Sequence, residues 1–134
     1  MINAAQIKRG DIVYDLGCGD GRLLFAAEKK KAKGVGFEIA PLIYLLAVAR
    51  KLLARSKTKI LMRNFLKTNL RKTNVIFCYL IPSMMPDLAG KIKKECSRGT
   101  RIISNTFHIP GLTPVRVYRK DAKTKMPTIY VYKI

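Results

Sequence analysis

The sequence of 134 residues has no tryptophan, a single histidine, three cysteines and only eight acidic residues. The cysteines lie far apart and form no CxxC pair, so we expect neither a disulfide framework nor a bound metal. No apolar run approaches the roughly 18 residues that a membrane-spanning helix needs. Because the first ten residues are also too polar for a secretory signal, we expect a cytoplasmic protein.

Positive charge is the strongest feature of the composition. Lysine and arginine together number 27, which gives a formal net charge of +19, and they are spread along the whole chain. Such an excess attracts polyanions, so nucleic acid is a candidate partner, although a well-solvated lysine-rich surface explains the same composition. Hydrophobic residues make up 49% of the chain, which is enough for a core, and the length suits a single domain over residues 1–134.

Short apolar segments alternate with amphipathic ones along most of the chain. The apolar segments, which predict strands, are residues 11–16, 34–38, 59–62, 74–79 and 101–104. The amphipathic segments, which predict helices, are residues 22–31, 41–53 and 87–96. In the second helix, Pro41 suits the first turn and the apolar stripe consists of Leu42, Leu45, Leu46, Ala49, Leu52 and Leu53.

The C-terminal part of the chain differs from the rest. Residues 115–119 and 128–133 alternate between apolar and polar side chains, which predicts an antiparallel hairpin connected through residues 121–127. The whole order predicts an α/β fold: a doubly wound, Rossmann-like, mostly parallel sheet with a C-terminal antiparallel hairpin.

A glycine-rich turn follows the first predicted strand. The string DLGCGDGR, residues 15–22, places Gly17, Gly19 and Gly21 after that strand, and Glu38 ends the next one. Three of the eight acids, Asp15, Asp20 and Glu38, therefore fall at the sheet edge where such folds bind their ligands. Glycines let a backbone approach a ligand closely, and a carboxylate after the second strand can accept hydrogen bonds from a ribose diol.

Two classes of cofactor compete for this turn. A dinucleotide fingerprint, GxGxxG, requires a third glycine where this chain has Arg22, and the acids would repel phosphate oxygens. S-adenosylmethionine carries an ammonium and a sulfonium instead, and carboxylates attract both of these cations. A phosphate-binding P-loop is excluded because the chain has no GxxxxGK[ST] string. The turn therefore favours the methyl donor.

The strings DLGCGDGR and VGFE resemble the first and second motifs of the class I, seven-β-strand methyltransferases. Residues 74–82 (NVIFCYLIP), 84–88 (MMPDL) and 98–104 (RGTRIIS) are similar to one branch of that family, the small protein-lysine methyltransferases. That branch includes an archaeal broad-specificity enzyme and the mitochondrial enzymes that modify ATP synthase c-subunit and adenine nucleotide translocase. The resemblance covers roughly residues 9–110 and implies a methyltransferase that uses S-adenosylmethionine.

The resemblance also implies roles for single residues. It places the methionine end of the cofactor at the glycine turn, the ribose at Glu38 and the adenine beyond the third strand, where Asn64 replaces the usual aspartate. The reactive methyl group would lie beside Tyr79, the one catalytic candidate, which would orient a lysine amine. The expected cofactor-binding residues are Asp15, Gly17, Gly19, Asp20, Gly21, Glu38, Ile39, Asn64 and Phe65, the last through its backbone N–H.

The methyl acceptor stays open among three alternatives. Lysine ε-amines of proteins are the acceptor that the family resemblance implies. The net charge of +19 favours RNA, although residues 78–82 (CYLIP) lack the Asn/Asp-Pro-Pro-aromatic turn that is typical of enzymes methylating exocyclic base nitrogens. A basic module that binds S-adenosylmethionine without activity is the third alternative. The oligomeric state is open as well.

Overall fold

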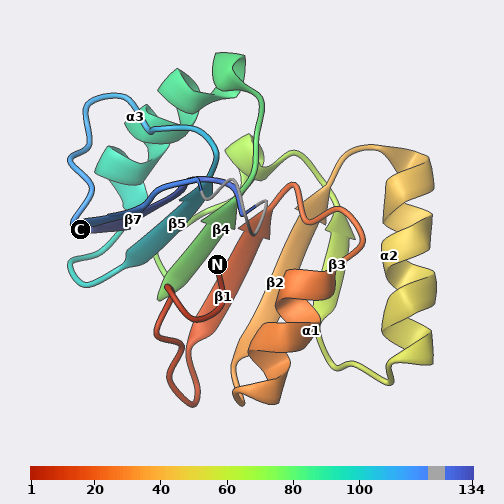
Figure 1. Cartoon of the computed structure of the whole chain (residues 1–134). Coiled ribbons are helices and arrows are strands. Elements are labelled where there is room, and N and C mark those ends of the chain that lie inside the picture. The colour runs from red at the N-terminus through yellow and green to blue at the C-terminus, as the bar shows by residue number, and fades with distance from the viewer. Residues whose placement is uncertain (121–125) are drawn as a thin grey trace.

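A computed structural model describes residues 1–120 and 126–134. In the described residues, seven strands form one sheet in the order β3-β2-β1-β4-β5-β7-β6 (Figure 1). The strands are β1 (Ile12–Leu16), β2 (Lys33–Glu38), β3 (Lys59–Met62), β4 (Val75–Cys78), β5 (Arg101–Asn105), β6 (Arg116–Tyr118) and β7 (Ile129–Lys133). The first five are parallel, and every pair of neighbours among them is hydrogen-bonded in register. The predicted doubly wound, mostly parallel fold is confirmed.

The C-terminal hairpin is confirmed too, with one feature that alternation alone does not reveal. β6 and β7 pair antiparallel, but β7 is the strand that joins the sheet, because it also pairs antiparallel with β5. β7 is therefore an interior strand, while β6 has all three residues exposed at the sheet edge. Most of the predicted connection, residues 121–125, lies outside the described residues.

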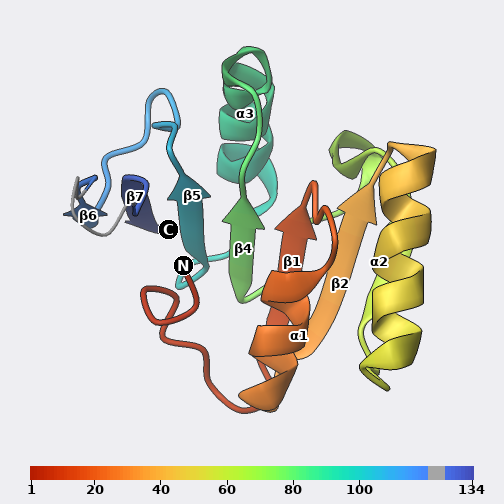
Figure 2. The same cartoon turned by 45° about the vertical axis from the view of Figure 1, so that its right-hand side comes forward.

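Helices cover both faces of the sheet (Figures 1 and 2). α1 (Arg22–Lys29) and α2 (Pro41–Leu53) pack on one face, where Leu24, Ala27 and Ala47 join a core with Val13 and Phe77. α3 (Met85–Glu95) packs on the opposite face, where its buried side chains join a second core with residues of β1, β4 and β5. The described helices are all too short and insufficiently apolar to cross a membrane.

The prediction for the apolar stripe of α2 is wrong. Leu45, Leu52 and the other four residues of that stripe lie on the solvent side of the helix. The side of α2 that faces the sheet contains Tyr44, Ala47 and Val48, which pack in the same core as Ile60 of β3. Because α2 has apolar residues on both sides, periodicity does not decide which side packs, and the small Ala47 permits the closer approach to the sheet.

The topology favours ligand binding at one edge of the sheet. From β1 the chain moves outward to β2 and β3, and it then crosses to β4 on the other side of β1. The strand order therefore reverses between β1 and β4, and open α/β sheets bind ligands beyond the carboxyl ends of the strands at such a point. The glycine turn after β1 and the segment after β4 both lie at this edge.

Candidate functional site

The glycine turn is held in place by β2. The N–H groups of Gly17 and Cys18 both donate to the carbonyl oxygen of Phe37, at 2.9 and 3.0 Å. Gly17, Gly19 and Gly21 all have positive φ, of 79°, 54° and 80°, as the sequence predicts. Residues with side chains seldom adopt these angles, so the backbone path of the turn depends on glycine.

Gly19 faces open space. A Cβ built there meets no atom within 4 Å, whereas a Cβ at Gly21 would lie 2.8 Å from the ring of Phe25. Gly21 thus gives room for α1 to start against the turn. Gly19 thus exposes its backbone to open space, where a ligand can contact it.

Glu38 connects the end of β2 to the turn. Its Oε2 accepts the N–H of Gly19 at 3.1 Å, and its Oε1 accepts the N–H groups of Ile39 and Ala40 at 2.8 and 2.9 Å. A carboxylate has about four lone-pair sites, so one site on Oε2 stays free for a ribose hydroxyl. Glu38 can therefore shape the turn and hold a ligand at once.

Asp15 is the buried acid of the site. Its side chain lies in β1 and the residue is only 4% exposed. Burial raises the pKa of the Asp15 carboxyl well above its ordinary value of 3.8, and the nearby charges of Glu38 and Asp20 raise it further. A cation at this position would favour ionised Asp15, which is what the ammonium or the sulfonium of S-adenosylmethionine supplies.

Asp20 has partners of its own. The Arg22 guanidinium donates to it at 2.8 and 3.1 Å, and Arg50 of α2 forms a second ion pair with the same carboxylate. These contacts, with the hydrogen bond from Arg22 as the largest cause, lower the pKa of Asp20 below its ordinary value. Arg22 lies only two residues from Asp20 in the sequence. Nothing in the sequence indicates Arg50, which lies 30 residues from Asp20.

The cysteine thiols near the turn are not nucleophiles. Cys18 is buried, and its side chain packs against Gly36 in β2, where an added Cβ would lie 2.6 Å from the sulfur. Burial and the charge of Asp15 raise the pKa of Cys18 to about 12, and burial raises the pKa of Cys78 to about 12. Both thiols are therefore protonated at neutral pH.

The residues expected to hold adenine lie at the carboxyl ends of β2 and β3. Ile39 is 61% exposed and offers an apolar surface directly after Glu38. Asn64 caps the short 3-10 helix η1 (Phe65–Lys67), and its Oδ1 accepts the N–H of Leu66 at 2.9 Å. A second lone pair on Oδ1 stays available for an adenine amino group. The N–H of Phe65 is the first in η1 and has no partner within that helix.

Tyr79 follows β4 directly and is 61% exposed. Tyr79 is therefore a surface residue and does not belong to the sheet core. β4 is the neighbour of β1, with Leu16 paired to Cys78, so Tyr79 leaves its strand at the same level as the glycine turn leaves β1. The phenol can therefore serve a reacting group at the edge where the turn lies.

The residues present fit S-adenosylmethionine. The open space at Gly19, the free site on Glu38 and the buried Asp15 carboxyl beside the charges of Glu38 and Asp20 match a ligand with a ribose and two positive charges. Asp15, Gly19 and Glu38 are brought into one cluster. Asn64, Phe65 and Tyr79 lie at the same sheet edge, after β3 and β4. Among the described residues, no group of three or more histidines, cysteines or acids is arranged to hold a metal.

Comparisons with known proteins point the same way. A family model described as the ANTKMT methyltransferase domain matches residues 15–116. The chain is 33% identical to a protein-lysine N-methyltransferase of Saccharolobus islandicus, over 100% of this chain and 86% of that protein. It is 31% identical to the mouse lysine N-methyltransferase of the ATP synthase c-subunit, over 85% of this chain, but spans only 47% of that protein.

A solved structure is similar over nearly the whole chain. The crystal structure of an RNA methyltransferase from Salinibacter ruber, in complex with S-adenosyl-L-homocysteine, superposes with a TM-score of 0.89 at 27% identity. The match covers 99% of this chain and 86% of that one. The fold and the class of cofactor thus agree between the site and its relatives, whereas the named acceptors of those relatives differ.

Proposed function

The chain belongs to the ANTKMT methyltransferase domain family, and we propose that it methylates lysine side chains of proteins with S-adenosylmethionine as donor. The observation that carries the proposal is the cluster of Asp15 and Glu38 around the open glycine turn. The identity of 33% over the full chain to a named protein-lysine N-methyltransferase supports the lysine acceptor.

The residues of the turn bind and orient the donor. Asp15, and the glycine backbone beside it, would hold the methionine end, and Glu38 would accept from the ribose. Asn64, Ile39 and the Phe65 N–H would hold the adenine. S-adenosylmethionine supplies an electrophilic methyl group on a positively charged sulfur.

For methyl transfer, the lysine nitrogen must be uncharged and must be held close to the methyl group. Lysine has an ordinary pKa near 10.4, so its ammonium must lose a proton before the nitrogen can attack. Desolvation at the site lowers that pKa, and the carboxylates attract the charged side chain to the edge in the first place. Tyr79 would orient the amine through its hydroxyl or its ring face, because in-line transfer requires the reacting atoms at about 3–3.5 Å.

RNA is the second candidate acceptor. The similarity to the Salinibacter ruber structure, which is described as an RNA methyltransferase, and the net charge of +19 both favour it. The segment after β4 argues against the transfer of methyl groups to exocyclic base nitrogens, because residues 78–82 (CYLIP) contain neither an acid nor an amide beside the candidate aromatic residue.

Methyl transfer from a labelled donor separates these candidates. The protein is incubated with S-adenosylmethionine labelled in the methyl group, together with a lysine-rich peptide or with single-stranded RNA. We expect label in the peptide and none when its lysines are replaced by arginine. Label in RNA alone would reject the lysine acceptor. Cofactor binding without any transfer, under conditions where the Saccharolobus islandicus relative is active, would show a binding module without activity.

A further inference from the structure

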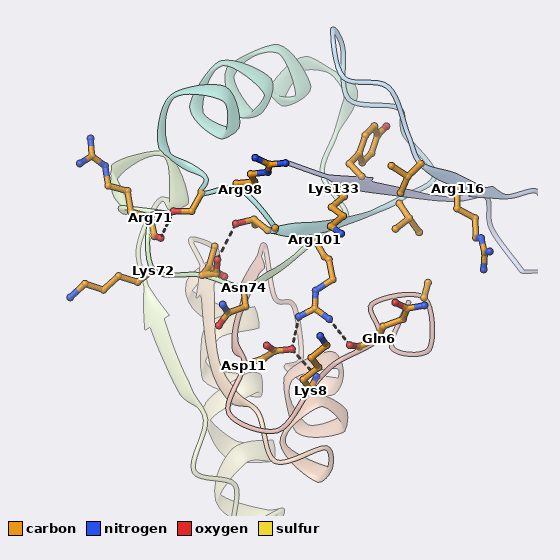
Figure 3. A pocket seen from close by; sticks show the side chains of 18 of the residues that line it. Gln6, Lys8, Asp11, Arg71, Lys72, Asn74, Arg98, Arg101, Arg116 and Lys133 are labelled. Atoms are coloured by element: carbon orange, nitrogen blue, oxygen red, sulfur yellow. Dashed lines mark hydrogen bonds and ion pairs between the residues drawn. The ribbon is translucent and has the colours of Figure 1, made fainter.

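A cavity lies at the edge of the sheet opposite the glycine turn. It has a volume of about 810 Å³ and is lined by the segments that precede β4 and β5, by the N-terminal segment and by β6 and the end of β7 (Figure 3). The segments before β4 and β5 belong to the amino ends of these strands, whereas the glycine turn follows a carboxyl end. This cavity, the basic cleft, is therefore separate from the methyl-donor site.

Positive charge dominates the basic cleft. One acid, Asp11, lines it against seven cations, which are Lys8, Arg71, Lys72, Arg98, Arg101, Arg116 and Lys133. Asp11 is already neutralised, because its carboxylate accepts from Arg101 at 2.6 Å. Arg101 also donates to the backbone carbonyls of Ala5 and Gln6, so it braces the N-terminal segment against the sheet.

The remaining six cations have no carboxylate partner among the residues that the structure describes. All six are exposed. The Arg116 guanidinium contacts Tyr118, whose hydroxyl accepts at 3.3 Å and whose ring centroid is 5.9 Å away. Like charges gathered in a hollow repel each other, and an anion bound there would relieve that repulsion.

The arrangement of the six cations indicates an elongated anion. Figure 3 shows Arg71 and Lys72 pointing outward at one side, Arg98 and Lys133 between, and Arg116 at the other side, with Lys8 below them beside Asp11. Side chains that point apart cannot converge on one phosphate group. A chain of phosphates that crosses the cleft would meet them in succession.

An aromatic ring adds a second kind of contact. Tyr118 lines the cleft beside Arg116, and it is 42% exposed. Proteins that bind single-stranded nucleic acid combine a basic groove for the backbone with exposed aromatic rings on which bases stack. A hollow also suits a strand better than a planar bilayer, and an acidic peptide would leave the ring of Tyr118 unused.

We propose that the basic cleft binds single-stranded nucleic acid, with Arg98, Lys133 and Arg116 on the phosphates and a base stacked on Tyr118. This goes beyond the proposed function, since the strand is held at the edge away from the methyl donor and is a docked partner rather than the acceptor. Binding of a polyanion also gives a role to part of the net charge of +19, because methylation of lysine does not require a basic protein.

Binding of a fluorescent oligouridylate of about 15 nucleotides, followed by anisotropy without any cofactor, tests the proposal. We expect log Kd to change steeply between about 50 and 200 mM salt, because counterions are released from the strand. The double variant R98E/R116E should bind at least about tenfold more weakly, and removal of two contacts should reduce the salt slope by about 1.4.

The control is K29E/K30E, which makes the same change of charge at exposed lysines at the end of α1, outside the cleft lining. Equal weakening by both double variants would overturn the proposal, because it would show attraction to net charge alone. Tyr118→Ala should weaken binding roughly fivefold or more and leave the salt slope unchanged, and Tyr118→Phe should retain the affinity.

Two further results would overturn the proposal. One is binding of vesicles with anionic lipid, or of polyglutamate, that is lost in R98E/R116E while oligouridylate binding is kept. The other is methyl transfer to the bound strand, which would make it the acceptor. Methylation of the lysine-rich peptide is measured separately with the same variants, so that failure of the cleft and failure of the proposed function give different results.

Discussion

The Oε2 of Glu38 accepts the N–H of Gly19 at 3.1 Å, so the acid at the end of β2 holds the middle of the turn that follows β1. Glu38 is the last residue of β2, and Gly19 lies 19 positions earlier, in the turn that follows the neighbouring parallel strand β1. The carboxylate that is expected to accept from ribose thus also fixes the backbone against which the methionine end would lie. Substitution of Glu38 should affect both parts of the cofactor.

Replacement of Glu38 by alanine should weaken binding of S-adenosylmethionine. Loss of hydrogen bonds to a charged group costs about 1.5–3 kcal/mol, which corresponds to about 10- to 100-fold in Kd. Calorimetry with the purified protein measures this change. An unchanged Kd in Glu38→Ala would show that the ribose is held elsewhere.

Gly19→Ala should separate cofactor binding from stability. The new Cβ meets no protein atom within 4 Å, but it would enter the space that the cofactor is expected to fill. Gly10→Ala is the matched control, because Gly10 also has positive φ and open space around its Cβ, yet lies before β1. Both variants should lose about 1–2 kcal/mol of unfolding free energy, the cost of a left-handed alanine. Only Gly19→Ala should weaken cofactor binding. Equal cofactor Kd values in the two variants would argue against a ligand at the turn.

Tyr79→Ala should reduce turnover and leave cofactor affinity nearly unchanged, and Tyr79→Phe shows whether the hydroxyl or the ring is responsible. The exposed phenol lies beyond β4, and its expected contact is with the acceptor amine. Misplacement of the reacting nitrogen lowers kcat by about tenfold or more. If the ring face orients the amine, Phe retains activity that Ala loses, and if the hydroxyl does so, both variants lose it. A large increase in the Kd of the cofactor with unchanged kcat would contradict this role.

The raised pKa of Asp15 implies that the unfolding free energy depends on pH. Asp15 takes up a proton more readily in the folded protein than in the unfolded chain, because burial and neighbouring acids disfavour its charge. The folded state therefore binds more protons above pH 3.8, and the unfolding free energy should fall as the pH rises toward the raised pKa of Asp15. Asp15→Asn should lack this decline, as urea denaturation at a series of pH values would show. A parallel pH dependence in the two proteins would mean that Asp15 does not titrate in this way.

Substitutions on the two sides of α2 should differ in their effect on stability, although leucine and alanine have similar helix propensities. Leu45 is 60% exposed, so Leu45→Ala should change the unfolding free energy by less than about 0.5 kcal/mol. Ala47 is fully buried, so Ala47→Leu should cost about 1–3 kcal/mol through overpacking. Urea denaturation of both variants tests the assignment. A larger loss in Leu45→Ala would place the leucine side of α2 against the core.

Local features of this molecule were predictable from the sequence, and distant pairings were not. The glycine turn and the strand before it depend on neighbouring residues, so their positions follow from short strings. The ion pairs of Arg50 with Asp20 and of Arg101 with Asp11 join residues 30 and 90 positions apart, which no local pattern indicates. The basic cleft likewise assembles from segments scattered between residues 4 and 133, and only its charge is evident in the composition. The packing side of α2 was ambiguous because both of its sides are apolar.

We propose that the open turn at Gly19, bounded by Asp15 and Glu38, holds S-adenosylmethionine. A crystal structure of the protein soaked with S-adenosylhomocysteine tests it most directly. The account predicts density for the ligand against Gly19, with its ribose on Glu38, its adenine near Asn64 and its sulfur facing Tyr79. A turn without ligand density, while the compound binds at the opposite edge of the sheet or not at all, would contradict the account.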